Sequence, residues 1–139
     1  MGSSLYERLG GIEAIMAAVG DFEDRVGKDD RINRKFAKSD LDRFVKELAD
    51  QLCETTGGPC TYTGRTMKQA HTDMGVTNGE FDALIEDLVA TLDNFKVGKG
   101  EQGEVLSLLN PLREEIVEVD SSQVGTALPS TFVPAPPLG

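Results

Sequence analysis

Residues 77–95 read TNGEFDALIEDLVATLDNF, and this stretch indicates an amphipathic helix more clearly than any other part of the chain. Thr77 and Glu80 stand three residues apart at its start, the spacing of a capping box in which each side chain satisfies a free backbone N–H group. Apolar side chains then recur at helical spacing, so they share one face that we expect to be buried. That face consists of Phe81, Leu84, Ile85, Leu88, Val89, Leu92 and Phe95.

The same three-four spacing continues on both sides of this stretch, and no alternating strand pattern competes with it. Upstream, it predicts helices over residues 12–26 and 40–52 and a short helix over 64–71. Downstream, a helix over 105–116 contains Pro111, which we expect to kink it because proline lacks the backbone N–H donor. The sequence therefore predicts an all-α fold.

The chain has 139 residues, which is the size of a single domain. We place the helical domain at residues 1–119. Residues 120–139 contain four of the six prolines and carry no charge after Asp120. Such a composition cannot continue a helix, so this tail is predicted to be extended or disordered.

The charge balance excludes several classes of partner. Fourteen Lys and Arg residues stand against 24 Asp and Glu residues, for a net charge of −10 and a pI near 4.5. Nucleic acids and anionic lipids both require a basic surface. No apolar run approaches the roughly 20 residues of a membrane span. We therefore expect neither a nucleic acid nor a membrane as partner.

The chain contains one histidine, His71, and two cysteines, Cys53 and Cys60. A metal site built from several imidazoles therefore cannot form within one chain. The cysteines flank a turn-like stretch and either form a short-loop disulfide or remain free thiols. A zinc site with His71 is a third arrangement, although the spacing matches no known zinc pattern. The start of the chain resembles no signal peptide, so we expect a cytoplasmic protein as the chain stands. A removed leader and an oxidised cysteine pair would instead indicate a periplasmic or exported protein.

Several short motifs, in this order and at these spacings, resemble the first group of the truncated haemoglobins. They are LYERLGG at 5–11, GGP at 57–59, YTGR at 62–65, MKQAH at 67–71, Val76-Thr77, Phe81, LVATL at 88–92 and Leu109 to Val117. The resemblance covers residues 4–118 and leaves the tail outside. It implies a shortened globin, in which a two-over-two helical sandwich encloses haem b.

The family's proximal ligand to the haem iron falls on His71. The residue types agree, because imidazole is a common ligand of haem iron and Met67 lies on the same helical face four residues earlier. The single histidine then leaves the opposite side of the iron without a second imidazole. The competing interpretation is a helical structural domain without haem.

Residue-by-residue matching places apolar side chains around the haem and cations near its propionates. Phe36 matches the phenylalanine that packs on the haem face, and Arg43 and Lys68 are the matching cations. The remaining matched pocket residues are Phe44, Leu48, Leu52, Met67, Val76, Phe81, Leu84, Ile85 and Leu88.

The distal side departs from the family pattern. Glu23 stands where relatives have a tyrosine, Leu48 where they have a glutamine, and Phe44 one turn earlier. The pair that donates hydrogen bonds to bound oxygen is therefore missing, and we expect an apolar pocket that holds oxygen less tightly. Glu23 either points outward or, if buried and protonated, acts as a general acid. Lys46 lies off the apolar stripe, so its use as an internal iron ligand would require the helix to rotate.

These residues favour reversible binding of oxygen, nitric oxide or carbon monoxide. The enzymatic alternatives are nitric oxide dioxygenation, which needs an electron-donating reductase as partner, and a peroxidase-like activity with Glu23 as the acid. We expect a monomer, with a dimer as the alternative.

Overall fold

The computed structural model describes residues 4–36, 41–63, 71 and 74–129, without the side chains of residues 41 and 42. Its described part is helical, which confirms the all-α prediction, and none of its helices is both long and apolar enough to cross a lipid bilayer. The elements are α1 (Leu5–Leu9), α2 (Gly11–Gly27), η1 (Asn33–Phe36), α3 (Leu41–Thr55), α5 (Asn78–Asn94), α6 (Lys99–Leu109), η2 (Asn110–Leu112) and α7 (Arg113–Ile116).

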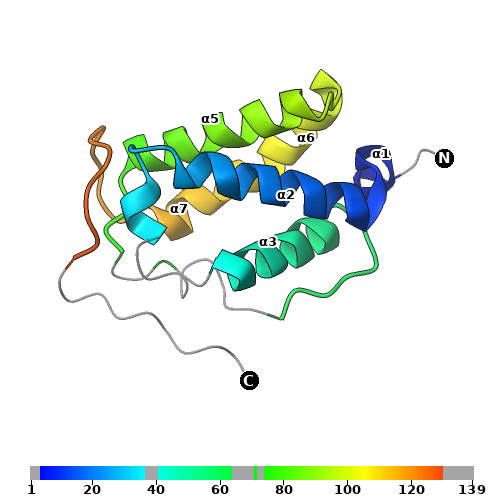
Figure 1. Cartoon of the computed structure of the whole chain (residues 1–139), viewed down its shortest axis with the longest axis horizontal. Coiled ribbons are helices and arrows are strands. Elements are labelled where there is room, and N and C mark those ends of the chain that lie inside the picture. Colours follow the sequence, from blue (N-terminus) through cyan, green and yellow to red (C-terminus); the bar gives the residue numbers. More distant parts are fainter. Residues whose placement is uncertain (1–3, 37–40, 64–70, 72–73, 130–139) are drawn as a thin grey trace.

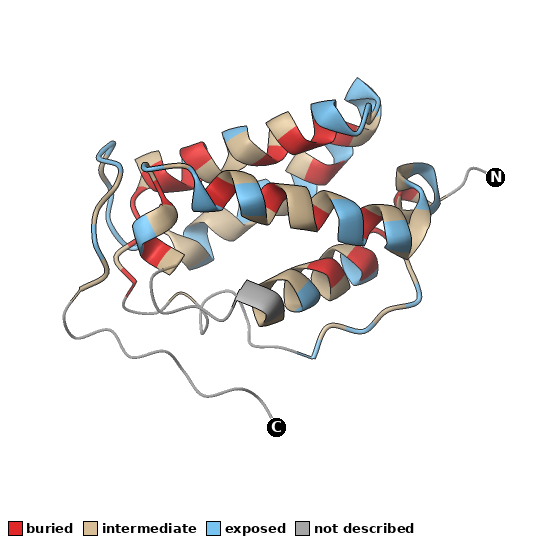
Figure 2. Ribbon diagram, viewed as in Figure 1, coloured by how far each residue is buried: buried red, intermediate tan, exposed pale blue. Residues whose placement is uncertain are grey.

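The helices form two pairs that pack face to face. Figure 1 shows α2 beside α3, and α5 with α6 and α7 on the other side. Helix α2 contacts both α3 and α5, and all three helices carry buried residues along their length (Figure 2). The resulting arrangement is the expected two-over-two sandwich. Its central core contains Leu5, Phe22, Val26, Ile32, Ala83, Leu88, Leu92 and Val105.

Helix α1 is a single short turn that the apolar pattern did not predict. The Ser4 hydroxyl caps it by accepting the Glu7 N–H group at 3.1 Å. Gly10 follows with φ of 105°, a left-handed conformation that lets the chain reverse into α2. Arg8 then ties α1 to α6, since its guanidinium donates to Glu101 at 2.9 Å and to Glu104 at 2.8 Å. Local capping and a tertiary ion pair therefore stabilise a helix that is too short to form alone.

Helix α5 begins with the predicted capping box. The Thr77 hydroxyl accepts the Glu80 N–H group at 3.0 Å, and the Glu80 carboxylate accepts the Thr77 N–H group at 3.0 Å. Phe95, predicted on the buried face, is instead 41% exposed because the helix ends at Asn94 and the backbone changes direction there.

The predicted kink at Pro111 is confirmed. Helix α6 ends at Leu109, the 3₁₀ turn η2 contains Pro111, and α7 follows from Arg113, so the α-helix is interrupted at the proline. This turn brings Arg113 back to α5, where its guanidinium lies 4.6 Å from the centroid of the Phe81 ring and donates to Asn78 at 3.1 Å. The break therefore lets the last helix close the molecule over α5.

Residues 120–129 continue past the expected domain boundary as irregular chain that contacts the helices. The boundary itself lies in a parallel bridge between Thr77 and Val119, and the Val119 N–H group donates to the Val76 carbonyl at 3.1 Å. In these ten residues the tail is irregular chain that hydrogen-bonds to the start of α5. Residues 130–139 lie outside the described part.

Two aspartates meet where the segment after α2 reaches α5. Asp29 accepts hydrogen bonds from the backbone and the guanidinium of Arg31 at 2.9 to 3.0 Å, which lowers its pKa. Oδ2 of Asp87 is buried and finds no hydrogen-bond partner within the described part of the chain. Burial and the neighbouring Asp29 carboxylate raise the pKa of Asp87 to about 7.

We expect this pair to make stability depend on pH. Asp87 holds its proton more tightly in the folded chain than in the unfolded chain, where its pKa is about 4. Its contribution to the free energy of unfolding is therefore complete below about pH 4 and is lost as the pH rises through about 7. Urea unfolding of the wild type between pH 5 and 8 measures this loss. Asp87→Asn flattens the curve, whereas Asp24→Asn at an exposed site leaves its slope unchanged. Parallel curves for wild type and D87N would contradict the assignment.

Candidate cofactor site and internal cavity

An aromatic pair marks the predicted pocket. The rings of Phe36, from η1, and Phe44, from α3, meet edge to face with centroids 5.1 Å apart. Both are only partly buried, as are Leu48 and Leu84, and all four pack against the central core that contains Leu88. The structure thus brings five of the predicted pocket residues onto one apolar cluster, and four of them keep part of their surface exposed.

Other predicted pocket residues have contacts of their own. Val76 forms a separate buried cluster with Met74, against which Ile116 and Val117 pack. Phe81 is buried beneath the Arg113 guanidinium. Leu52 packs on the cluster between α2 and α3, and Ile85 is partly buried on α5. Packing within the protein accounts for Val76, Phe81 and Leu52 without a cofactor.

His71 is partly buried, so its imidazole is not sealed in the core. Its carbonyl accepts the Met74 N–H group at 3.2 Å. The predicted pocket residues Met67 and Lys68 lie outside the described residues.

The charged residues of α3 form pairs along the helix surface. Arg43 Nε lies 3.2 Å from Glu47, and Lys46 Nζ lies 3.2 Å from Asp50. The Lys46 side chain is 76% exposed, so it faces solvent rather than the aromatic pair. This orientation opposes the hypothesis that Lys46 is an internal iron ligand. Arg43 is partly exposed and already pairs with Glu47. An anionic group beside the aromatic pair would therefore share the Arg43 guanidinium with Glu47 or replace Glu47 as its partner.

Glu23 lies on α2 immediately after Phe22. Phe22 is buried and faces the interior, whereas Glu23 is partly buried. Successive residues of an α-helix point about 100° apart, so Glu23 lies at the border of the apolar face. No pocket contact of its carboxylate has been found among the described residues.

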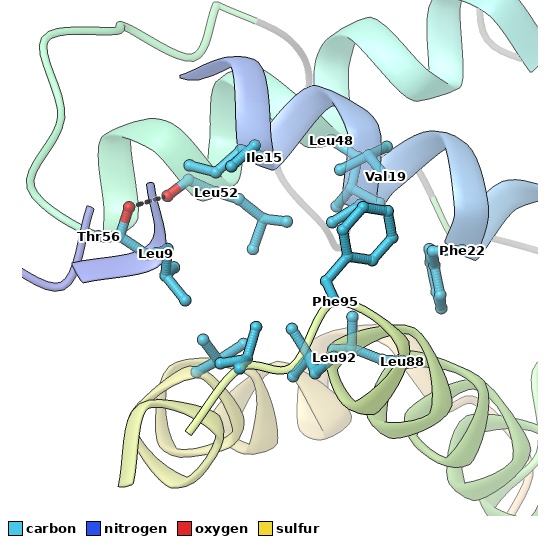
Figure 3. Close-up of a pocket in the computed structure, with 14 residues that line it drawn as sticks. Leu9, Ile15, Val19, Phe22, Leu48, Leu52, Thr56, Leu88, Leu92 and Phe95 are labelled. Atoms are coloured by element: carbon cyan, nitrogen blue, oxygen red, sulfur yellow. Dashed lines mark hydrogen bonds between the residues drawn. The ribbon is translucent and has the colours of Figure 1, made fainter. Parts of the chain in front are cut away.

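A cavity of about 120 Å³ lies between the two helix pairs (Figure 3). Figure 3 shows Val19, Phe22 and Leu48 on one side and Leu88 and Leu92 on the other. The other lining residues are Leu9, Ala14, Ile15, Ala18, Leu52, Thr56, Phe95, Val97 and Val105.

The walls of this cavity are almost wholly apolar. Thr56 contributes the one hydroxyl, and it donates to the Leu52 carbonyl at 2.6 Å instead of to the interior. Such a cavity offers water no hydrogen-bond partners and suits small apolar molecules. Sequence analysis did not predict it, although a signal exists. Ala14 and Ala18 stand one turn apart on α2, where larger side chains would fill the space.

Cys53 and Cys60 form a disulfide behind the cavity wall. The sulfurs are 2.07 Å apart and the Cα atoms 5.6 Å apart. Cys53 is fully buried against Ile15, Val19 and Ala49. The bond joins the last turns of α3 to the loop that follows, and it leaves neither sulfur as a thiolate for a zinc ion.

Comparison with known proteins identifies the family. Residues 4–118 match the sequence model of the bacterial-like globins. The group 1 truncated hemoglobin of Tetrahymena pyriformis is 36% identical over 114 residues, which cover 82% of this chain and 94% of the relative. The group 1 truncated hemoglobin GlbN of Synechocystis is 40% identical over 113 residues, covering 76% of this chain and 89% of the relative.

Solved structures agree with this match. The Fe(III) form of the Tetrahymena pyriformis truncated hemoglobin superimposes with a TM-score of 0.80 at 35% identity, covering 84% of this chain and all of the other. The 2/2 hemoglobin of Synechococcus sp. PCC 7002, solved in the cyanomet state with covalently attached heme, gives 0.78 at 34% identity and covers 83% of this chain and 98% of the other. The chain therefore belongs to the bacterial-like globins, and within them to the group 1 truncated haemoglobins.

We expect the disulfide to stabilise the fold. Closing so short a loop removes chain entropy from the unfolded state, which corresponds to about 2–3 kcal/mol of unfolding free energy. Urea unfolding with and without a dithiol reductant measures this difference. The matched control is Cys53→Ala/Cys60→Ala, whose stability is lower and does not change with the reductant. The prediction would be contradicted if the free energy of unfolding of the wild type did not change with the reductant although mass spectrometry showed that the disulfide was reduced.

Proposed function

We propose that this chain binds haem b with His71 as the proximal iron ligand and reversibly binds diatomic gases on the opposite side. One observation supports this proposal most directly. Phe36, Phe44 and Leu48 form a partly exposed apolar surface in a truncated haemoglobin that contains a single histidine. A donor set of one imidazole and an apolar wall suits haem, and it does not suit a multi-imidazole metal centre.

The partial burial of these side chains supports the fit. Phe36, Phe44, Leu48 and Leu84 retain exposed apolar surface in the protein alone. A flat apolar group laid against them removes that surface from water, and each 100 Å² removed stabilises binding by about 2.5 kcal/mol. Leu88 is already buried in the core against which these side chains pack. The aromatic pair thus supplies both the area and the shape for a planar ring system.

When bound, haem supplies an iron that takes a diatomic gas on the side away from the imidazole. The protein's own contribution on that side is apolar. The side chains of Phe44 and Leu48 have no N–H or O–H group, so they exclude water and cannot donate a hydrogen bond to the gas. Oxygen gains more from such a donor than carbon monoxide does. We therefore propose weak retention of oxygen and no dedicated proton donor for catalysis.

The apolar cavity between the helix pairs supports a role for small gases. Leu48 belongs both to the wall of the cavity and to the cluster around the aromatic pair. An apolar space of this size holds a diatomic gas without breaking any protein hydrogen bond. We propose that it stores gas molecules next to the pocket. An electron-donating reductase is a partner only if the protein also turns over a substrate.

Replacing His71 tests the proximal ligand. We expect His71→Gly to lose the optical bands of an imidazole-ligated haem and to release haemin to a competing apoglobin more than about tenfold faster, the effect of a lost bond of 1.4 kcal/mol or more. Added imidazole should restore the bands, and Lys46→Ala should behave as the wild type. Unchanged bands in H71G would contradict the assignment, and a wild type that takes up no haemin would overturn the proposed function.

A donor placed at Leu48 tests the apolar distal side. Leu48→Gln introduces a side-chain amide, and one hydrogen bond of about 1–1.5 kcal/mol slows oxygen dissociation by about tenfold. Stopped-flow measurement should show a much smaller change for carbon monoxide. The matched control Leu48→Met conserves volume and apolar character, so its oxygen dissociation stays close to that of the wild type. Equal oxygen rates in L48Q and L48M would show that Leu48 does not face the gas.

A further inference from the structure

Residues 120–129, named here the C-terminal strap, are bound to the start of α5. The Asn78 amide donates to Asp120 at 2.8 Å, and the Gly79 N–H group donates to the Ser121 carbonyl at 3.1 Å. The backbone approaches so closely that a Cβ atom at position 79 would collide with the Ser122 carbonyl. Figure 1 shows the strap in orange beside the first turn of α5. The strap lies beyond the residues 4–118 that define the family.

A buried ion pair lies beneath the strap. The side chain of Lys35, from η1, is 4% exposed and that of Glu80, from α5, is 1% exposed, with Nζ and Oε1 3.5 Å apart. Lysine and glutamate are almost never buried unless they are paired, because removing either charge from water costs several kcal/mol. A pair held this deep needs further hydrogen bonds to satisfy its remaining donors and acceptors.

The strap supplies those hydrogen bonds, chiefly through Thr126. Lys35 Nζ donates to the Thr126 hydroxyl at 2.7 Å, to the Thr126 carbonyl at 3.0 Å and to the Ala127 carbonyl at 3.2 Å. Glu80 Oε2 accepts the N–H and the hydroxyl of Thr126, each at 2.8 Å. All three protons of the Lys35 ammonium group thus have acceptors on the strap. The N–H group, the carbonyl and the hydroxyl of Thr126 each form a hydrogen bond with Lys35 or Glu80. Removing the strap would leave both charges short of partners.

The same strap contacts two segments that the proposed pocket needs. On one side it is held to the segment that ends at Phe36, because Gly125 N–H donates to the Arg31 carbonyl at 2.6 Å and Arg34 donates to the Gly125 carbonyl at 3.1 Å. On the other side Leu128 packs against the Met74 and Val76 cluster, a few residues after His71. These segments are about forty residues apart in the sequence, and the strap contacts both.

We propose that the C-terminal strap, anchored by Thr126 on the Lys35–Glu80 pair, positions Phe36 and the segment after His71 and thereby retains haem. This inference rests on the proposed function, because it assumes that Phe36 and His71 contact the cofactor. Lys35, Glu80 and Thr126 are positioning residues in this scheme. A strap that only added stability would change the unfolding midpoint and leave haem retention and the iron–imidazole bond unaltered.

The test uses the full-length protein loaded with haemin. Thr126→Val removes the hydroxyl at nearly constant volume, whereas Lys35→Met/Glu80→Gln removes both charges and keeps a residue suited to the capping box. Three readouts follow each variant: haemin transfer to excess apoglobin, the iron–histidine band in the resonance Raman spectrum, and hydrogen exchange of amides 120–129. Thr126→Ser, which keeps the hydroxyl, and Val124→Ala, at a side chain that is 44% exposed on the strap, are the matched controls.

We expect faster amide exchange in the strap, about tenfold faster haemin transfer and a shifted iron–histidine band in both test variants, while both controls remain within about twofold of the wild type. Wild-type haemin transfer and an unshifted band in a variant whose strap exchanges freely would overturn the inference. A strap that stays protected in both variants would overturn it as well, because the ion pair would then not be its anchor. Both results would leave the proposed function standing. The proposed function fails only if the wild type binds no haemin or binds it without His71.

Discussion

Where α2 crosses α5, Phe22 and Val26 join Ala83 and Leu88 in one buried cluster. Ala83 is 1% exposed, and its small side chain lets the two helices approach closely. Thr91, fully buried on α5, donates its hydroxyl to Asp21 on α2 at 2.7 Å, so the crossing is fixed by a polar contact as well as by apolar burial. Helix α3 packs on α2, and α6 and α7 pack on α5. The relative position of the two helix pairs therefore depends on this crossing.

Two kinds of apolar surface lie near this crossing. Alanines of α2 leave a cavity that leucine, valine and phenylalanine side chains line. Phe36, Phe44 and Leu84 pack on the same core and remain partly exposed. Partial exposure of apolar side chains is common on protein surfaces, and Met16, Phe95 and Leu108 are exposed as well. Membership of the group 1 truncated haemoglobins is therefore what favours a cofactor-binding globin over a helical domain without haem.

The C-terminal strap shows how burial changes the interpretation of the tail. Sequence analysis predicted an extended or disordered tail because residues 120–139 are rich in proline and almost without charge. Composition could not reveal that Lys35 and Glu80, which are 45 residues apart, meet in the interior and require the polar atoms of Thr126. In the sequence each of the two reads as an ordinary surface charge. Their burial, which the sequence does not show, gives the tail polar partners in the interior of the protein.

Local patterns predicted what depends on neighbours along the chain. The spacing of Thr77 and Glu80 predicted the capping box, Pro111 predicted the break between α6 and α7, and apolar periodicity predicted the long helices, because backbone hydrogen bonding and side-chain direction are local properties. The resemblance to the truncated haemoglobins matched His71 to the iron ligand and Phe36 and Phe44 to pocket positions, and the contact between the two rings emerged only in the structure. Apolar periodicity did not predict the short α1, because this helix is stabilised by ion pairs between Arg8 and the glutamates of α6.

By itself, the sequence determined the helical class and limited imidazole chemistry to His71, since these follow from the spacing of apolar residues and from the count of histidines. Tertiary structure alone decided that Val76 and Phe81 pack within the protein, that the two cysteines join behind a cavity, and that the strap covers a buried ion pair. The physical reason is that burial and charge pairing depend on contacts between segments distant in the chain, which composition and periodicity do not encode.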